Sequence, residues 1–506
     1  MKSFLLFIFL QIIPAPVEFA ETGKDCQVHS VRVATGRRAS RGFRTMAASL
    51  PAFAQKEAYS IDVGKKRIRI EALTEEGAFR AQQTLRMMEL SGQPIHCCKI
   101  TDYPRFEHRG LMIDESRSFK GKEFIMKQID AMALLKLNVL HLHLTDAAGW
   151  RIEIKSHPEL TQKAAWRIGR TYAEWEKNGY PFCTEDAPQA YGGYYTQDDL
   201  REIVEYAARR FIKVIPEIEM PGHSMEVNRT CPELACIDST GRRRNWAWDL
   251  CPGNEGTFRL LEDVLDEVMD IFPGKYIHIG GDEAVMKDWR ECVNCKARME
   301  AEGYSDVHQL QGYLVRRMAN YLQEHGRTAV GWDEILETGV PQDAVIQSWR
   351  GSSGGRKAAA AGHKVIMSPN THCYFDYYQD LIRKEPLATG ELTSLHWVYT
   401  YNPLEGISEE DASCILGLQA NLWCEKVPTP EHAEYMLYPR LFAIAETAWS
   451  PTSLQRDPVE FRARARALLE VFRTLGYNTF DMDSESDFAI EGKRRTRTGE
   501  IIYPAF

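Results

Sequence analysis

The residues best suited to chemistry lie in "KYIHIGGDEAVMKDW", residues 275–289, where two adjacent carboxylates follow an apolar run. The run ends at Ile279, two glycines follow, and Asp282 and Glu283 then stand side by side. Two neighbouring carboxylates oppose each other's ionisation, so different environments can push their pKa values apart. One ionised and one protonated carboxyl group is what general acid and base catalysis requires.

The position of the pair at a strand end gives it a use. Neighbouring residues on a strand point to opposite faces, but where the strand breaks into a loop both side chains can turn toward one pocket. We expect Asp282 to stay ionised, and its charge together with partial burial to raise the pKa of Glu283. The simpler alternative is a solvated acidic turn that caps the next helix.

Elements that could position this pair recur along the chain as short apolar runs separated by helical patterns such as 122–137 and 197–211. The runs are 108–114, 139–146, 213–220, 276–283, 328–335, 344–350, 364–370 and 415–423. Strand and helix in alternation indicate a parallel sheet. Eight such units predict an α/β fold of the (β/α)8 TIM-barrel type with long loops.

Polar and aromatic residues gather at the C-terminal ends of these runs. They are Asp114, Arg117, Asp146, Glu219, His223, Asp282, Glu283, Trp332, Asp333, Trp349, Asn370, Trp423 and Glu425. Barrel active sites are built at that face from several strand ends. A doubly wound open sheet would also bind ligands at strand ends, but it would not need eight contributions. The barrel is therefore the favoured fold.

The chain divides into four predicted parts. Alternation over 59–73 and a helical pattern over 76–90 predict a small α+β domain before the barrel, and Pro104 marks the change of pattern. The predicted boundaries are a signal peptide at 1–22, the small domain at 23–104, the catalytic barrel at 105–450, and a C-terminal helix and tail at 451–506.

The N-terminus carries Lys2 and then ten residues, Phe4–Ile13, that are almost entirely apolar. This run is too short to span a bilayer and is typical of a signal peptide, with cleavage expected near Ala20 to Gly23. Export to a periplasm or to the outside of the cell would follow, whereas a buried terminal strand is the alternative. No other stretch is long and apolar enough to predict a membrane span.

Composition excludes several classes of protein. The 506 residues are 44% hydrophobic and 26% charged, which is ordinary for a globular chain. The formal net charge of −9 argues against a nucleic-acid partner. The glycine-rich segment 351–355 lacks the Lys-Ser/Thr ending of a phosphate loop. We therefore predict no cofactor.

Twelve cysteines raise the question of a metal. Cys292 and Cys295 have the spacing of a half-site, but a structural zinc ion needs four ligands, so a local disulfide or two free thiols are favoured. The other cysteines show no metal spacing, among them Cys97, Cys98, Cys231, Cys236 and Cys251. We predict no metal, although an exported chain could pair some cysteines as disulfides.

Paired carboxylates among tryptophans and tyrosines are typical of sugar sites, because aromatic faces pack on pyranose rings while acids hold hydroxyls. The chain also resembles the β-N-acetylhexosaminidases of glycoside hydrolase family 20 over about residues 55 to 450. The resemblance is carried by "HRGLMIDESRSF", "LNVLHLHLTDAAGWRIEIKSHPELT", "GGYYTQDDLREIVEYAARRFIKVIPEIEMPGHS", "YIHIGGDEA", "GWDEIL", "QSWRG" and "NLWCE".

The resemblance implies an exo-acting, retaining glycosidase that removes terminal β-linked N-acetylglucosamine or N-acetylgalactosamine from glycans. In this family the substrate's own acetamido oxygen attacks the anomeric carbon and forms an oxazolinium ring. By similarity, Glu283 is the general acid and base, and Asp282 orients the acetamide N–H. His223 and Asp146 would support Glu283 from behind.

Further residues match the family's sugar contacts. By similarity, Arg117 and Glu425 bind ring hydroxyls, and Tyr374 bonds the acetamide oxygen with Asp376 beside it. Trp332, Trp349 and Trp423 match the aromatic walls around the acetamido group. The plain alternatives are a salt bridge at the barrel mouth for the charged residues and barrel core for one of the tryptophans.

One departure concerns Ala147 and Ala148, where the family usually has Asp-Gln after the residue that matches Asp146. Two small apolar residues at the pocket rim would alter the hydrogen bonding of Asp146 and the preference for leaving groups. Two other functions compete with hexosaminidase activity. One is a catalytically silent glycan-binding protein, and the other is a related specificity such as lacto-N-biosidase or sulfated-hexosamine hydrolase. The oligomeric state is not predicted.

Overall fold

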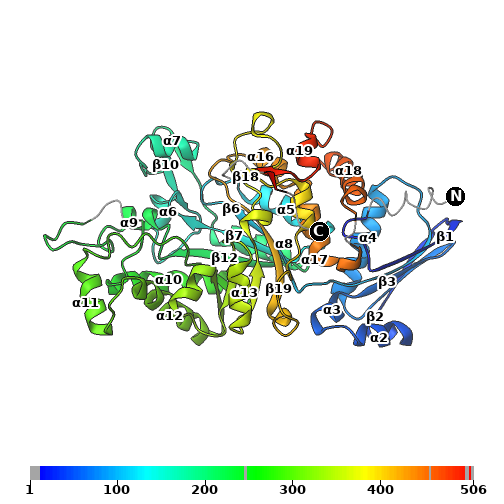
Figure 1. Cartoon of the computed structure of the whole chain (residues 1–506), viewed down its shortest axis with the longest axis horizontal. Coiled ribbons are helices and arrows are strands. Elements are labelled where there is room, and N and C mark those ends of the chain that lie inside the picture. Colours follow the sequence, from blue (N-terminus) through cyan, green and yellow to red (C-terminus); the bar gives the residue numbers. More distant parts are fainter. Residues whose placement is uncertain (1–11, 244–247, 455–456, 496–500, 503–506) are drawn as a thin grey trace.

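The computed structural model describes residues 12–243, 248–454, 457–495 and 501–502. Within them, eight parallel strands form a closed barrel in the order β12-β13-β14-β15-β16-β19-β6-β7 (Figure 1). The strands are β6 His108–Asp114, β7 Val139–His143, β12 Lys213–Met220, β13 Tyr276–Gly280, β14 Thr328–Trp332, β15 Val345–Ser348, β16 Val365–Met367 and β19 Ile415–Leu422. Each predicted run supplies one of these strands, so the TIM-barrel prediction is confirmed.

Most strands end before the predicted run does. β13 stops at Gly280 and β14 at Trp332, each three residues short of the predicted end. The backbone explains the first case, because Gly280 and Gly281 have φ of +61° and +96°, which no strand accommodates. The polar residues at the ends of the runs therefore lie in loops at the C-terminal face of the barrel.

Helices pack around the barrel. They include α5 Lys122–Leu134, α8 Gln197–Ala208, α10 Glu255–Ile271, α12 His308–Glu324, α13 Ser353–Ala360, α16 Pro430–Leu437 and α17 Arg440–Trp449. Both helices predicted from their patterns, α5 and α8, are present but end three residues early. Between β14 and β15 the described chain has only the 3-10 segment η2 Asp333–Thr338, so this unit departs from the regular alternation.

Long loops carry additional short elements on the site face. After β7 come β8 Thr145–Asp146, β9 Gly149–Trp150, α6 Glu159–Gln162, β10 Trp166–Ile168, α7 Tyr172–Lys177 and β11 Ala190–Gly192. The loop after β12 holds α9 Met225–Thr230, and the loop after β13 holds α11 Val293–Glu302. After β16 come α14 Asn370–Cys373, β17 Tyr377–Tyr378, η3 Ile382–Lys384, β18 Thr389–Leu392, α15 Leu395–Thr400 and η4 Asp411–Cys414.

The N-terminal domain, at the right of Figure 1, is a five-stranded sheet in the order β1-β5-β3-β4-β2. Its elements are β1 Glu18–Asp25, β2 Ser30–Thr35, η1 Gly36–Arg38, α2 Arg41–Ala48, α3 Ala52–Glu57, β3 Tyr59–Val63, β4 Arg67–Ala72, α4 Glu75–Leu90 and β5 His96–Asp102. The predicted small α+β domain is therefore present, with its hairpin and its helix where the patterns placed them.

The predicted end of the signal peptide, at residue 22, falls inside strand β1. This strand begins at Glu18 and pairs antiparallel with β5, with Glu18 opposite Thr101. Ile12 and Ile13 are also buried in the core. The fold does not test where the chain is cleaved, so the leader stays a prediction. Residues 1–11, which hold half of the predicted leader, lie outside the described residues.

The C-terminal segment packs on the junction between the two domains. It comprises η5 Thr452–Leu454, α18 Pro458–Thr474, α19 Asp487–Ile490 and the strand pair β20 Arg494–Arg495 with β21 Ile501–Ile502. Arg464 of α18 donates from Nη1 to Glu446 Oε2 of α17 at 2.9 Å and to the Ile12 carbonyl at 3.2 Å. This buried pair ties both ends of the described chain to the barrel.

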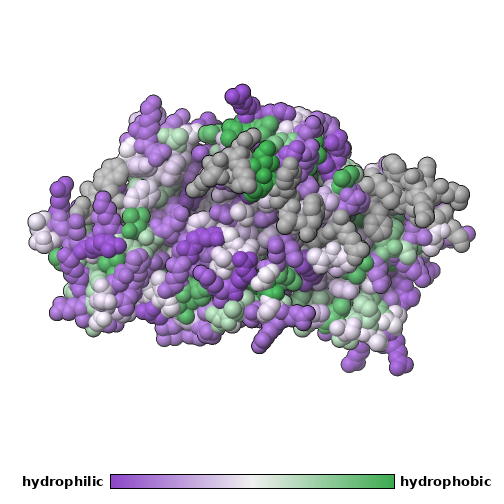
Figure 2. Space-filling model, in the orientation of Figure 1, coloured by the Kyte–Doolittle hydropathy of each residue, from purple (hydrophilic) through white to green (hydrophobic). Residues whose placement is uncertain are grey.

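The surface in Figure 2 is mainly hydrophilic, with purple polar residues distributed over the barrel and its loops. This agrees with the negative formal charge and ordinary composition of the chain. Among the described helices, none combines the length and the apolar character needed to cross a membrane.

Candidate active site

A cavity of about 210 Å3 opens at the C-terminal face of the barrel. Its walls are Arg117, His223, Asp282, Glu283, Trp349, Tyr374, Asp376, Tyr377, Thr389, Trp423 and Glu425. Pockets for drug-sized ligands run from roughly 300 to 1,000 Å3, so this one has room for a single sugar residue. The walls include nine predicted site residues. Tyr377 and Thr389 were missed because they belong to an insertion after β16 that has no strand-end pattern.

The turn after β13 aims both adjacent carboxylates at the cavity. A Cβ at Gly280 would lie 1.9 Å from Glu219 Oε1, and a Cβ at Gly281 would lie 2.3 Å from Ile335 Cγ2, so the backbone here passes too close to its neighbours for any side chain. Glu283 itself has a φ of +45°, a strained value for a non-glycine residue. Only this tight turn brings Asp282 and Glu283 to the same wall.

The two carboxylates differ in exposure. The Asp282 side chain is 12% exposed, whereas the Glu283 side chain is 57% exposed at the cavity mouth. Burial raises the pKa of Asp282 above its ordinary value, and the nearby His223 partly offsets this. Asp282 and Glu283 therefore occupy different environments, which is what the sequence analysis required for two adjacent carboxylates with separate roles.

His223 links the pair to Asp146. Its Nδ1 lies 3.3 Å from Asp146 Oδ1, and its Nε2 lies 3.4 Å from Glu283 Oε2 and 3.6 Å from Asp282 Oδ2. Burial disfavours its charged form, but Asp146 and Glu283 outweigh that effect and raise the pKa of His223 well above its usual value. His223 thus lies between three carboxylates that favour its protonated form, in the place predicted for it.

The predicted direction of the Glu283 pKa is wrong for the ligand-free site. The hydrogen bond from His223 is the largest influence and lowers the pKa of Glu283, and burial opposes it only in part. Adjacency in sequence suggested that Asp282 would be the dominant neighbour. In the fold the imidazolium is a direct partner of Glu283, so a positive charge prevails.

Glu219 lies behind Asp282 and has a clearer role than its sequence suggested. Burial and the charge of Asp282 raise the pKa of Glu219 well above its usual range. Its hydrogen bond to Asp282 lowers the pKa of Asp282. Glu219 Oε1 also accepts from the Gly281 N–H at 3.3 Å. Glu219 therefore favours the charged form of Asp282, and it braces the turn.

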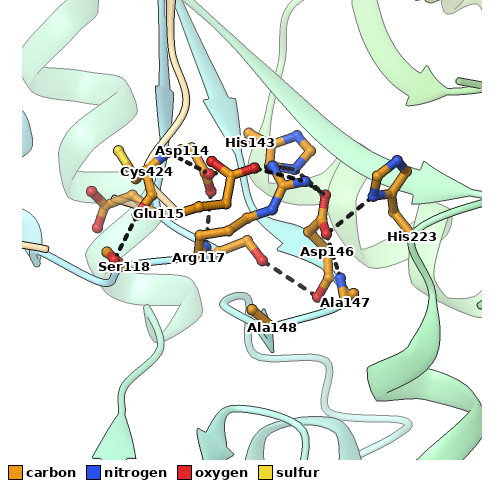
Figure 3. A network of polar contacts seen from close by, with 12 residues as sticks. Asp114, Glu115, Arg117, Ser118, His143, Asp146, Ala147, Ala148, His223 and Cys424 are labelled. Atoms are coloured by element: carbon orange, nitrogen blue, oxygen red, sulfur yellow. Dashed lines mark hydrogen bonds and ion pairs between the residues drawn. The ribbon is translucent and has the colours of Figure 1, made fainter. Parts of the chain in front are cut away.

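Arg117 supplies the positive charge on the opposite wall. Its Nη2 lies 2.7 Å from Asp146 Oδ2 and 3.6 Å from Glu425 Oε1, and its Cζ lies 4.9 Å from the centre of the Trp423 ring. Figure 3 shows Arg117 and His223 approaching Asp146 from opposite sides. Although burial opposes ionisation, Arg117 and His223 hold the pKa of Asp146 well below its usual range.

Ala147 and Ala148 do not lie at the cavity rim, so that prediction is wrong. Both are buried and pack against Trp175 and Met225, away from the cavity wall. The hydrogen bonding of Asp146 is complete, because the Ala147 N–H donates to its Oδ1 at 2.6 Å in addition to the contacts above (Figure 3). The backbone N–H makes this bond whichever side chain follows Asp146.

Two of the three predicted tryptophans form walls. The Trp349 and Tyr374 rings are nearly parallel, at 16°, with centres 6.1 Å apart, and Trp423 lies 6.1 Å from Tyr374. Trp332 is fully buried beneath them and donates from Nε1 to Glu217 at 2.8 Å. The structure therefore moves Trp332 from the predicted sugar contacts to the barrel core, because its side chain turns below the cavity floor.

Glu334 was missed by the sequence reasoning although it follows Trp332 closely. Its Oε2 accepts from Trp349 Nε1 at 2.9 Å, which fixes the orientation of that wall. Burial, reinforced by the charge of Asp282, raises the pKa of Glu334 to about 8. The signal was present in the "GWDEIL" segment, where Glu334 directly follows Asp333.

Several buried polar atoms of the cavity have no hydrogen-bond partner within the described residues. They are Arg117 Nε, His223 Nε2, Asp282 Oδ1, Asp376 Oδ1, Thr389 Oγ1 and Glu425 Oε2. Buried polar groups are normally paired, so unpaired ones that surround a cavity indicate a ligand rich in hydroxyl and amide groups. Burial raises the pKa values of Asp376 and Glu425.

The reasoning that excluded a four-cysteine site is wrong. Cys236 and Cys251 lie far from Cys292 and Cys295 in sequence, yet the fold brings all four sulfur atoms within 4.8 Å of one another. Spacing along the chain could not reveal this, because the ligand pairs come from the loops after two different strands. At the cavity, ligand atoms of His223, Asp282 and Glu283 also lie within 4.8 Å of one another.

A (β/α)8 barrel with carboxylates set among aromatic walls at its C-terminal face defines a carbohydrate site. Comparison with known proteins gives the family. The profile of glycosyl hydrolase family 20, catalytic domain, matches residues 106–452, and that of glycosyl hydrolase family 20, domain 2, matches residues 17–103. The chain belongs to glycosyl hydrolase family 20.

Two relatives are β-hexosaminidases. The chain is 40% identical over 426 residues to one from Porphyromonas gingivalis, covering 81% of this chain and 53% of that protein. It is 39% identical over 400 residues to one from Vibrio furnissii, covering 77% and 64%. The alignment thus spans about half of the first relative and less than two thirds of the second.

A solved structure also resembles the whole fold. The exo-β-N-acetylglucosaminidase from Vibrio harveyi, crystallised with N-acetylglucosamine, superimposes with a TM-score of 0.79 at 29% identity. The match covers 94% of this chain and 78% of that one. The barrel and the N-terminal domain are therefore shared together.

Proposed function

We propose that this protein is an exo-acting, retaining β-N-acetylhexosaminidase that removes terminal N-acetylglucosamine or N-acetylgalactosamine from glycans. The observation that carries the proposal is the division of the carboxylate pair. Asp282 is buried with a free oxygen, while Glu283 is exposed at the cavity mouth. Such a pair suits one carboxylate that holds an acetamide N–H and another that meets the leaving group.

Glu283 would act first as the acid. Its proton passes to the glycosidic oxygen, the bond from that oxygen to C1 breaks, and the substrate's acetamido oxygen forms a new bond to C1. Water then gives a proton to Glu283 and attacks C1 from the face that the leaving group vacated, which reopens the ring with retention. The bound sugar excludes water from Glu283 and so raises its pKa, which restores the proton that the free site disfavours.

Asp282 would stabilise the charge that develops on the acetamide nitrogen. The hydrogen bond with Glu219 lowers the pKa of Asp282 and so favours its negative charge, and the strained turn fixes the direction of its side chain. Tyr374 would hold the acetamide oxygen in position to attack C1, with Trp349 and Trp423 around the methyl group. Arg117 and Glu425 would bind the ring hydroxyls, because their unpaired atoms face the cavity from the far wall.

The cavity size favours release of one sugar at a time. A volume of about 210 Å3 suits a monosaccharide, whereas a lacto-N-biosidase must enclose a disaccharide. A silent binding protein would not need a general acid, whereas Glu283 presents an exposed carboxylate at the cavity mouth.

A panel of aryl β-glycosides tests the proposal. We expect hydrolysis of the N-acetylglucosaminide or the N-acetylgalactosaminide, and none of the lacto-N-bioside. Proton NMR of the first-formed sugar should show the β anomer, as retention requires. Sugar binding by isothermal calorimetry without hydrolysis of any glycoside would identify a binding protein instead.

We also propose that the chain is exported through an N-terminal leader. Support comes from the apolar run Phe4–Ile13 after Lys2, which has the length of a leader's apolar core. N-terminal sequencing of the protein from its own cells tests this. A mature terminus downstream of this run is expected, and an intact Met1 would contradict export by cleavage.

A further inference from the structure

We propose that Cys236, Cys251, Cys292 and Cys295 bind one structural Zn2+ ion. All four side chains are at most 1% exposed. The sulfur–sulfur distances are 3.9 Å for Cys236–Cys295, 3.7 Å for Cys251–Cys292 and 3.6 Å for Cys251–Cys295. Each of the four sulfur atoms thus has at least one other within 3.9 Å in the protein interior.

These distances are those of a tetrahedral metal site. Zinc–sulfur bonds of about 2.3 Å in a tetrahedron place the sulfur atoms about 3.8 Å apart. A disulfide would bring two sulfurs to about 2.05 Å, and none of the four cysteines is in a disulfide in the structure. A set of four sulfur ligands favours zinc or iron over the harder cations.

The chain is arranged to accept thiolates here. Cys292 is the N-cap of α11 and Cys295 lies in its first turn, where the helix dipole and free N–H groups favour negative sulfur. Cys236 and Cys251 come from the loop between α9 and α10. A Cβ at Gly253 would lie 2.2 Å from the Asn294 carbonyl carbon, so this glycine allows the two segments to meet.

Apolar residues enclose the four cysteines. Met286, Trp289, Val307 and Leu310 pack in one cluster with them, which excludes water from the sulfurs. Two hydrogen bonds also join the loops that carry the cysteines. Trp289 Nε1 donates to the Leu250 carbonyl at 3.0 Å, and the Val293 N–H donates to the Ile237 carbonyl at 3.0 Å. A dry, cross-linked pocket of this kind holds a metal in one geometry.

The ion would fix the loop that presents the proposed acid. Asp249, two residues before Cys251, accepts from the N–H groups of Val285 at 3.1 Å and of Met286 at 2.6 Å, just after Glu283. The four cysteines therefore join the loop after β12, which carries His223, to the loop after β13, which carries Glu283. On binding, four thiols release four protons and bond to Zn2+, so the site carries two negative charges.

Metal content of the purified full-length protein tests the inference directly, without reference to activity. Elemental mass spectrometry should find one zinc per chain. X-ray absorption at the zinc edge should show four sulfur neighbours at about 2.3 Å. Protein that lacks zinc is reduced and titrated with Zn2+, and one tight site is expected. The zinc assignment would be overturned if the protein contained iron in place of zinc. It would also be overturned if the cysteines formed two disulfides that resist this reconstitution, or if four reduced thiols bound no Zn2+.

Variants separate the site from other cysteines. Cys251→Ser and Cys295→Ser should each lose the zinc and lower the melting temperature, whereas Cys231→Ser should keep it, because Cys231 is buried nearby but outside the group. If a variant does not fold, stepwise modification of wild-type thiols with a mercurial should release zinc as these four react. Zinc retained in both cluster variants would refute the assignment, and hydrolysis without zinc would leave the proposed function standing.

Discussion

Replacing Asp282 by Asn tests how the proposed site stabilises its intermediate. The change keeps the shape of the side chain and removes one negative charge from a group that is 8% exposed. A charge pair about 4 Å apart is worth about 4 kcal/mol at an effective dielectric constant of 20. Since each 1.36 kcal/mol is a factor of ten, the charge alone accounts for about 10³-fold in rate. The Asn oxygen still accepts the acetamide N–H, so we expect a loss of 10² to 10³ in kcat/KM.

The assay compares hydrolysis of an aryl N-acetylglucosaminide with inhibition by a thiazoline that mimics the oxazolinium ring. Both should weaken together, because they depend on the same charge. Asp306→Asn is the matched control, since Asp306 is a surface acid whose side chain is 59% exposed. A loss below tenfold, or a fall in rate with unchanged thiazoline affinity, would refute the role given to Asp282.

Three further predictions follow from the geometry. Glu283→Gln should lower turnover of substrates with poor leaving groups by about 10² or more, with a smaller loss for activated aryl groups; equal small losses would contradict its role as the acid. His223→Gln removes the charge that lowers the pKa of Glu283, so the basic limb of kcat/KM should move to higher pH; an unchanged profile would separate His223 from the acid. Gly280→Ala places a Cβ against Glu219 and should cost stability and activity, whereas Gly326→Ala, with φ of +73° and open space, should cost only modest stability; equal losses would exclude the clash.

The barrel was predictable because each strand is a short apolar run with a polar end. The alternation of strand and helix can be recognised from short stretches of sequence, and eight such units are compatible with few folds. The strand ends were less predictable, since glycine conformation at Gly280 and Gly281 stops β13 before the carboxylates. The pairing of Glu18 with Thr101 was not predictable either, because it joins distant parts of the chain.

The site was predictable in its members and less so in its electrostatics. Motifs placed Glu283, Asp282 and His223 together, but the sign of the Glu283 pKa shift depends on exposure and on which partner is nearest. Trp332 looked like its two companions in sequence and differs from them only in the direction of its side chain. Glu334 and the cysteine cluster were missed because their partners come from other strands.

The most direct measurement of substrate-assisted catalysis is a series of aryl glycosides that differ only in fluorination of the acetamido methyl group. Each fluorine withdraws electrons from the acetamide oxygen and weakens it as a nucleophile, while the leaving group and sugar ring stay the same. If that oxygen attacks C1, kcat/KM should fall steeply from the acetyl to the trifluoroacetyl substrate, and the 2-hydroxy glucoside should be inert. A flat series, or a sugar trapped covalently on a side chain of the protein, would contradict the mechanism.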